Sequence, residues 1–259
     1  MHHVGGIFSG KGGLFTLNRK CPVTPIPLRA RYSKNIDNLM MVGRCISVTH
    51  IGLGPTRVML TGGTMGEAVA VAAHLCRKYG KLPRGLVGEH IDELQQLLLK
   101  DGMFIPGAVN HDPADLALSA VITADSSAEG CEPGCVINGR TRKTDGEPYA
   151  WISAAPAPQS ITLTFDGEKT VSQVRVTSDI PFEEYTYGFR AMPVLRDLVT
   201  EFTVSLLTAG GWRETAHVTD NIHRLAVVDF APVKASAVKL TVLKTLDSDR
   251  VVIPEIRIY

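Results

Sequence analysis

The sequence predicts an α+β protein in which a mixed, partly helical segment is followed by an antiparallel β-sandwich. Residues 1–103 contain apolar residues at helical spacing, whereas residues 115–259 form short alternating apolar runs between turn residues. The change falls in a stretch rich in Gly, Pro, Asn and Asp, residues 104–114, which we expect to be a linker. We therefore predict two domains, 1–103 and 115–259.

In the first domain, the apolar run Asn38–Val42 predicts a buried strand, and Arg57–Leu60 predicts a second short extended piece. Gly66–Tyr79 has a small, apolar face at helical spacing, and Gly80 follows where a C-terminal glycine belongs. Glu89–Lys100 repeats the helical spacing and predicts a second helix that packs in the core. A helix that opens at a glycine cluster leaves its first N–H groups accessible to an anionic or electron-rich ligand atom.

In the second domain, short runs with alternating apolar residues predict strands that pair in an antiparallel sandwich. Asp166-Gly167 and Gly210-Gly211 have the composition of hairpin turns. The expected strands are Ser160–Phe165, Val171–Thr177, Phe202–Leu207, Ala226–Phe230, Ala237–Leu243 and Ile253–Tyr259.

Composition and charge restrict the class of protein and partner. The chain has 259 residues, enough for one large domain or two modest ones, with 27 Lys+Arg against 26 Asp+Glu. Because the charges balance and form no block, we expect no nucleic-acid partner. The longest apolar runs are too short to span a bilayer, and the N-terminus has no basic region followed by an apolar core. We expect neither a transmembrane segment nor a signal peptide, and the compartment stays open.

Several short motifs stand in a fixed order in the first domain. Asn38-Leu39 leads into Gly43-Arg44-Cys45-Ile46-Ser47, and His50, Arg57-Val58-Met59 and Gly62-Gly63-Thr64-Met65-Gly66 follow. From about Ile26 to Gly102, this order and spacing resemble the C-terminal, cofactor-closing segment of FAD-dependent oxidoreductases. The resemblance implies a partial FAD-binding α/β segment.

The resemblance also implies roles for named residues. Gly43 and Arg44 would lie beside the ribityl and phosphate part of FAD, and the glycine cluster would lie at the ring end, where the helix dipole favours negative charge on the reduced flavin. This cluster comprises Gly62, Gly63, Thr64, Met65 and Gly66. We place His50 and Arg57 closest to the substrate, where His50 could move a proton and Arg57 could hold a carboxylate. A surface or structural role for both is the alternative.

The dinucleotide-binding half of an FAD site is not found in the sequence. It requires Gly-x-Gly-x-x-Gly between a strand and a helix. The run Gly5–Gly13 has the glycines, but no strand precedes it and no apolar helix follows. It also mimics a phosphate-binding loop, yet Gly12 stands where Ser or Thr would bind magnesium. We expect FAD to bind only together with the missing half, in cis or in trans.

The second domain has a resemblance of its own. Val136-Ile137-Asn138-Gly139, Tyr149–Ser153, Gly210-Gly211-Trp212 and Pro254–Tyr259 resemble discoidin-type (galactose-binding-like) jelly-roll modules. The resemblance covers about Asp115 to Tyr259 and implies binding of glycans or membranes through loops at one end, sometimes with a structural calcium.

Each candidate ligand-binding residue of this domain also has a structural or solvent-exposed role as an alternative. Asn138, Asp145 and Glu255 could supply oxygen ligands for calcium, but scattered acidic loop residues are usually solvated, so we predict no metal site. Trp151 and Trp212 could stack on a sugar, although packing in the core is the role we expect. The long segment Asp179–Arg196, with its aromatic residues, predicts a contact loop.

The cysteines predict no disulfide framework, because five of them are scattered along the chain. They are Cys21, Cys45, Cys76, Cys131 and Cys135. Cys131 and Cys135 frame the turn sequence Glu-Pro-Gly, so they could pair, bind a metal or stay as two free thiols, which we favour.

The sequence thus predicts the C-terminal portion of an FAD-dependent oxidoreductase, with hydride transfer from a small or carbohydrate-like substrate, and an appended β-sandwich. One alternative is a non-catalytic glycan-binding or docking module that carries a vestigial flavoprotein segment. Another is a subunit whose dinucleotide-binding half is a separate polypeptide. An upstream reading frame that encodes Gly-x-Gly-x-x-Gly after a strand would favour the first.

Overall fold

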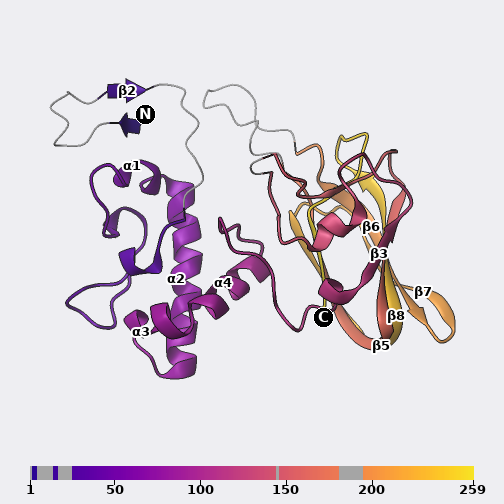
Figure 1. Ribbon diagram of the computed structural model, residues 1–259, viewed down its shortest axis with the longest axis horizontal. Helices are drawn as coiled ribbons and strands as arrows, with labels where there is room; N and C mark the ends of the chain where they lie inside the picture. Colours follow the sequence, from indigo (N-terminus) through magenta and orange to yellow (C-terminus); the bar gives the residue numbers. More distant parts are fainter. Residues whose placement is uncertain (1, 5–13, 17–24, 144–145, 181–194) are drawn as a thin grey trace. The chain divides into compact units, whose positions relative to one another are not determined.

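The structure is a computed structural model that describes residues 2–4, 14–16, 25–143, 146–180 and 195–259. The chain divides into two compact units, Met1–Ala108 and Val109–Tyr259. The helices concentrate in the first unit and the strands in the second, so the predicted α+β class is confirmed (Figure 1). The division falls inside the segment 104–114 that the sequence predicts as a linker.

The first unit is built around one long helix. Its core consists of buried aliphatic residues, which include Ala68, Ala72 and Leu75 of this helix and Leu94 and Leu98 of the last one. The elements are β1 (His2–Val4), which pairs with β2 (Leu14–Thr16), the 3₁₀ turns η1 (Leu28–Ala30) and η2 (Gly43–Cys45), and the helices α1 (Leu53–Thr56), α2 (Met59–Tyr79), α3 (Pro83–Glu89) and α4 (Ile91–Lys100).

The predicted start of the long helix is wrong. α2 begins at Met59 rather than at Gly66, and the Gly62 N–H donates to the Val58 carbonyl at 2.9 Å. Each glycine within a helix costs about 1 kcal/mol relative to alanine, yet the helix continues because Met65 is buried in its next turn. The predicted end is confirmed, since Gly80 is left-handed with φ of 61° and its N–H donates to the Cys76 carbonyl.

Two predicted extended pieces of the first unit are also wrong. A buried strand needs a ladder of partners, but in the described part of this unit Asn38–Val42 makes a single bridge, from Met40 to Tyr32. Val42 is exposed rather than buried. The second piece is absent because Arg57 ends α1 and Met59 already belongs to α2.

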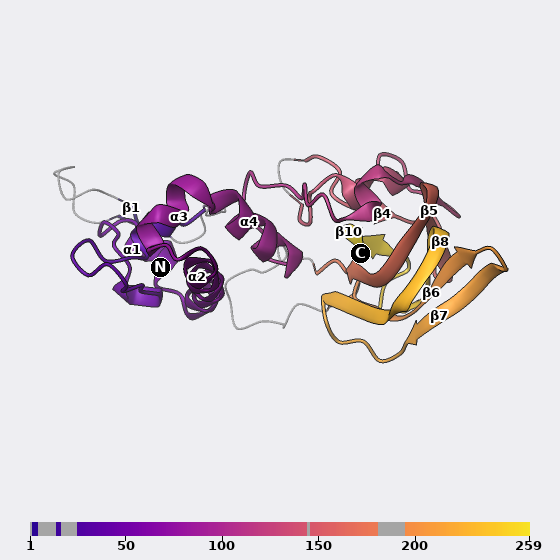
Figure 2. The same ribbon diagram turned by 90° about the horizontal axis from the view of Figure 1, so that it is seen from below.

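The second unit is an antiparallel β-sandwich, as predicted (Figures 1 and 2). Its large sheet has the strand order β10-β5-β8-β6-β7, with β3 also on β5, and β4 pairs with β9. The strands are β3 (Val121–Ala124), β4 (Trp151–Ile152), β5 (Gln159–Thr177), β6 (Val199–Thr208), β7 (Gly211–Val218), β8 (Leu225–Thr245), β9 (Val252–Ile253) and β10 (Glu255–Ile258), with 3₁₀ turns η3 (Leu116–Ser119) and η4 (Pro133–Ile137).

Two long strands each replace a pair of predicted ones. β5 contains both Ser160–Phe165 and Val171–Thr177, and β8 likewise merges the two strands predicted on either side of Pro232. The predicted turn at Asp166-Gly167 is instead a register shift between Thr164 and Lys169, with Gly167 at φ of 82°. The hairpin at Gly210-Gly211 is confirmed, because Thr208 pairs with Gly211 at the β6–β7 turn.

Alternation along the strands builds the core of the sandwich. Ile161, Leu163, Val174 and Val176 of β5 all face inward and are buried. Trp151 is fully buried in the same core, as expected, and its indole Nε1 donates to the Ser126 carbonyl at 2.9 Å. No helix in the described part of the chain has the length and hydropathy needed to cross a bilayer.

Candidate functional site

The predicted cofactor motifs meet at the N-terminal end of α2. Gly43, the first residue of η2, has a left-handed backbone with φ of 64°. A Cβ added to Gly62, in the first turns of α2, would lie 3.7 Å from the Cα of Gly43. The two glycines therefore pack backbone against backbone, which brings two motifs that are distant in sequence to one place.

The N-terminus of α2 has no side-chain cap. Val58 stands at the N-cap position and makes no side-chain hydrogen bond to the helix. The backbone N–H groups of Met59, Leu60 and Thr61 come before that of Gly62, which is the first to donate within the helix, to the Val58 carbonyl. These three N–H groups therefore form the positive end of the helix dipole. The sequence predicts that the accessible N–H groups follow Gly63. In the structure they lie one turn earlier, because α2 begins at Met59.

The glycine cluster lies within the helix and offers an open surface. A Cβ added at Gly63 or Gly66 would meet nothing within 4 Å. The Thr64 hydroxyl is used locally, because its Oγ1 donates to the Thr61 carbonyl at 2.9 Å. Met65 points the other way and is 1% exposed. Within the cluster, Met65 is therefore packed in the interior. Gly63 and Gly66 have no side chain to block another molecule from approaching the backbone.

The two predicted substrate-facing residues lie on the segment between η2 and α2. His50 is an exposed turn residue just before α1, and Arg57 is exposed at the end of α1, where its N–H donates to the Leu53 carbonyl at 3.1 Å. Arg44 of η2 is exposed as well. All three side chains are thus accessible in this unit.

Apolar side chains around this end of the unit are unusually exposed. Met59 is 90% exposed and Leu60 85%, although both belong to a helix whose other face is core. Val42, Val48 and Ile51 are exposed too. We call these five residues the apolar rim. Exposed apolar patches of this kind are typical of binding surfaces for other proteins or ligands.

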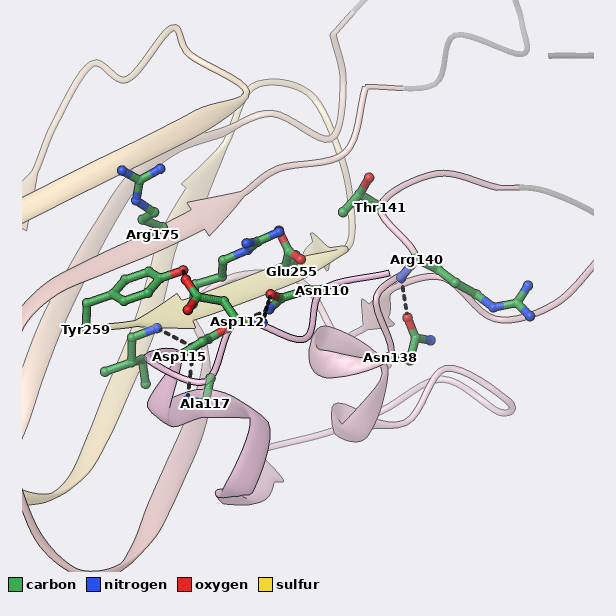
Figure 3. A network of polar contacts seen from close by, with 12 residues as sticks. Asn110, Asp112, Asp115, Ala117, Asn138, Arg140, Thr141, Arg175, Glu255 and Tyr259 are labelled. Atoms are coloured by element: carbon green, nitrogen blue, oxygen red, sulfur yellow. Dashed lines mark hydrogen bonds and ion pairs between the residues drawn. The ribbon is translucent and has the colours of Figure 1, made fainter. Parts of the chain in front are cut away.

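A polar network covers the outer face of β10 in the second unit (Figure 3). Asp115 is buried and accepts hydrogen bonds from the backbone N–H groups of Ala117 at 3.1 Å and Ile258 at 2.9 Å, and from Asn110 Nδ2 at 2.7 Å. Burial raises the pKa of Asp115, and these hydrogen bonds oppose the rise. The Tyr259 hydroxyl donates to Asp112 at 3.1 Å. Asn110 and Asp112, in the second half of the predicted linker, are therefore hydrogen-bonded to residues of the sandwich.

A second part of the network centres on a partly buried arginine, Arg224. Arg224 Nη2 donates to the Thr141 carbonyl at 2.7 Å. Burial, followed by the nearby charge of Arg142, lowers the pKa of Arg224 to about 10, while Asp179 and Glu255 oppose the shift. Sequence analysis missed this network, whose one visible signal is the run of charged residues within the short strand Glu255–Ile258.

The candidate calcium ligands are engaged in other contacts. Asn138 Nδ2 donates to the Pro148 carbonyl at 3.1 Å, and its Oδ1 accepts from the Arg140 N–H at 2.8 Å. Glu255 forms an ion pair with Arg257, 3.0 Å between Oε2 and Nε. Among the described residues, no group of three or more His, Cys, Asp or Glu side chains could hold a metal.

Some predicted features lie outside the described residues. They are the glycine run Gly5–Gly13, Cys21, Asp145, and most of the predicted contact loop Asp179–Arg196. The expectation that no strand precedes the glycine run is wrong, because β1 ends at Val4. Trp212 of β7, expected in the core, is 45% exposed, so that expectation is wrong. The strand register explains this, because Trp212 pairs with Leu207, on the face opposite the buried Leu206.

Comparison with known proteins bears on the first unit. Residues 1–98 match the family model of FAD dependent oxidoreductases. The match confirms the resemblance that the motifs of the first domain predict. It covers the segment that holds η2, the apolar rim and α2. No curated protein matches the chain.

Solved structures similar to the chain include several carbohydrate-binding modules. The family 32 module of Clostridium perfringens NanJ, in complex with galactose, is 16% identical, with 56% of this chain and 96% of that chain covered and a TM-score of 0.44. Chitosan-binding module 2 of a Paenibacillus chitosanase/glucanase, in complex with chitotriose, has 17% identity, coverages of 56% and 99% and a TM-score of 0.44. A fucose-binding module of Streptococcus pneumoniae is 16% identical, with 59% of this chain and 99% of that chain covered and a TM-score of 0.44.

Proposed function

We propose that the first unit is the cofactor-closing part of an FAD-dependent oxidoreductase, which transfers a hydride from a small organic substrate to the flavin. The observation that carries the proposal is that the family match coincides with the meeting of Gly43 and Gly62 beside the uncapped start of α2. These residues suit a flavin, because bare backbone allows close approach and the free N–H groups attract an electron-rich edge.

Within this proposal, each predicted residue has a role that its place supports. Gly43 and Arg44 would hold the ribityl and phosphate part, and Arg44 is exposed, so its guanidinium is accessible to a phosphate. The start of α2 would face the ring, where a dipole of roughly half a charge favours the reduced flavin. Gly62, Gly63, Thr64 and Gly66 would line the approach, and Met65 would anchor the helix in the core.

His50 and Arg57 are proposed to act on the substrate. His50 has an imidazole, a side chain that can accept and return a proton. Arg57 presents a planar guanidinium suited to a carboxylate or an oxyanion. Both lie on the segment that joins η2 to α2, so both would be next to the flavin ring if the start of α2 faces it.

Retention of FAD is proposed to require a dinucleotide-binding half, either in the same longer polypeptide or in a separate one. The apolar rim supports this, since residues as exposed as Met59 and Leu60 are expected to be covered in the working protein. The buried adenine and pyrophosphate contacts of a complete site would come from that half.

The test is the visible absorption spectrum of the purified chain, alone, with added FAD, and co-expressed with a dinucleotide-binding half encoded upstream or nearby. We expect a flavin band only in the co-expressed protein, and loss of that band when Met59 and Leu60 are both replaced by Asp. A colourless co-expressed complex that assembles correctly would refute the proposal. A flavin retained by the chain alone would refute the need for a second half.

A second candidate function, glycan binding by the sandwich, is favoured by Trp212. This indole is 45% exposed on β7, and Lys239 Nζ lies 4.6 Å from its ring centroid. An exposed indole beside a cation suits stacking against a sugar with an acidic group nearby. Binding of a glycan panel by the chain, lost in Trp212→Ala and kept in Arg213→Ala, would support this function. Equal binding by both variants would refute it.

A further inference from the structure

Two cysteines of the second unit stand at the ends of one tight turn. Cys131 and Cys135 enclose Glu132-Pro133-Gly134, and the Cys135 N–H donates to the Glu132 carbonyl at 3.0 Å. Pro133 occupies the first helical turn of η4, where its restricted φ favours this geometry. Both thiols are free and only partly exposed.

The turn is held to the core on both sides. Before it, the Cys131 N–H donates to the Ala128 carbonyl at 3.0 Å, and the Cys131 carbonyl accepts from the Ile152 N–H of β4 at 3.3 Å. After it, the Cys135 carbonyl accepts from the Asn138 N–H at 3.2 Å, and Val136 is fully buried in the core. The backbone of both cysteines is therefore held by hydrogen bonds on either side of the turn.

The charge of Cys131 also acts on the thiol of Cys135. Burial raises the pKa of the Cys135 thiol, and the charges of Cys131 and Glu132 raise it further. Cys131 is thus an electrostatic neighbour of Cys135 across the turn. A pair held in this way has a high effective concentration, which favours an internal bond over a bond to an external thiol.

We propose that Cys131 and Cys135 form a redox-active dithiol that closes to an internal disulfide on reaction with a small-molecule disulfide such as oxidised glutathione. One thiolate attacks a sulfur of the small disulfide and displaces one small thiolate. The second cysteine, as thiolate, then attacks the protein sulfur of this mixed disulfide and displaces the other small thiolate. The pair loses two protons and two electrons, and the small disulfide becomes two thiols.

Closure would lock the segment that covers β4. Cys131 binds Ile152 through its carbonyl, and the neighbouring Trp151 is a fully buried core residue. A disulfide across the turn restricts opening of this segment, so we expect a higher melting temperature for the oxidised protein. Because the attacking species is the thiolate, we expect closure to accelerate as the pH rises toward the raised pKa of Cys135.

The experiment equilibrates the full chain in buffers of graded reduced to oxidised glutathione, blocks free thiols by alkylation and maps the peptides by mass spectrometry. We expect one peptide that contains both cysteines and has lost two hydrogen atoms. The exposed Cys45 serves as an internal control, because with no partner in its turn it should carry only glutathione.

Variants test whether the bond is internal. Cys131→Ser and Cys135→Ser should each leave the remaining cysteine as a mixed disulfide with glutathione, and the melting temperature should no longer depend on the oxidant. Cys45→Ser should behave as the wild type. The proposal is overturned if the wild-type cysteines take up glutathione separately, or if both stay open to alkylation over the whole range. This readout needs only the wild-type protein, so it holds even if a variant folds poorly.

Discussion

Arg224 donates a hydrogen bond from Nη2 to the Thr141 carbonyl at 2.7 Å, although 83 positions separate the two residues. The contact joins the start of β8 to the loop after η4, two segments with no shared ladder. Asp179 and Glu255 act on the same guanidinium. Removal of a partly buried charge is costly, because the groups that it neutralises or hydrogen-bonds are left without their partner.

Replacement of this arginine is therefore expected to destabilise the sandwich strongly. Arg224→Met should lower the free energy of unfolding by about 1.5–3 kcal/mol, the usual contribution of a hydrogen bond to a charged group. Urea unfolding followed by tryptophan fluorescence measures this, because the chain's two tryptophans both lie in the second unit.

The matched control is Arg196→Met. Arg196 forms an ion pair with Asp247 at 3.5 Å, but both side chains are more than half exposed. Its removal should cost less than about 1 kcal/mol. Similar losses for the two variants would show that the Arg224 network contributes no more than a surface pair.

Removal of divalent cations is expected to leave the sandwich unchanged. Of the residues that could have bound calcium, Asn138 is used within its own loop and Glu255 is paired with Arg257. The melting temperature should therefore agree between excess EDTA and millimolar calcium. A calcium-dependent rise in the melting temperature would show that a metal competes successfully with these contacts.

The pH dependence of stability is expected to reveal the buried carboxyl of Asp115. Burial raises its pKa in the folded state, so the folded state binds the proton more tightly than the unfolded state does. Its contribution to the free energy of unfolding is complete below the unfolded pKa, about 4, and declines as the pH rises toward the folded pKa.

Asp115→Asn should remove this decline while preserving the shape of the side chain. Urea midpoints of the wild type and the variant should agree most closely at acid pH. The wild type should then fall relative to the variant as the pH rises toward neutral. Asp125 is a suitable control, because it lies nearer the surface and accepts one hydrogen bond, from the Ser160 N–H at 2.7 Å. Parallel midpoints for wild type and Asp115→Asn would contradict the raised pKa.

Local patterns predicted the local structure well and the long-range structure poorly. Alternation placed Ile161, Leu163, Val174 and Val176 in the core, and Gly80 correctly ended its helix. Asp166-Gly167 was predicted as a turn because a glycine with positive φ serves a bulge and a hairpin equally. Whether such a glycine forms a bulge or a hairpin turn depends on which strands pair on either side of it.

The candidate sites show the same division. Order and spacing of the motifs indicated the flavin-type segment, yet the start of α2 depends on packing of Met65, which outweighs the low helix propensity of the glycines. The contact between Asp115 and the Ile258 N–H spans 143 positions, and no local signal marks it. Such networks arise from tertiary pairing of polar groups that would otherwise be buried alone.

The glycines of α2 offer a test in which stability and cofactor binding are expected to change in opposite directions. Gly63 lies inside the helix, and a Cβ there meets nothing within 4 Å of this unit. Gly63→Ala should therefore stabilise the unit by about 0.4–1 kcal/mol through a smaller entropy loss on folding. If the bare face of this turn contacts the flavin, the added methyl should lower flavin content in the complete protein.

Gly88→Ala provides the comparison, because Gly88 lies within α3 and its added Cβ also meets nothing within 4 Å. It should stabilise the unit similarly and leave flavin content unchanged. The measurement pairs thermal unfolding with the ratio of flavin to protein absorbance for both variants. Equal flavin content in the two would place the cofactor away from Gly63, whereas a loss confined to Gly63→Ala could not be ascribed to a weakened fold.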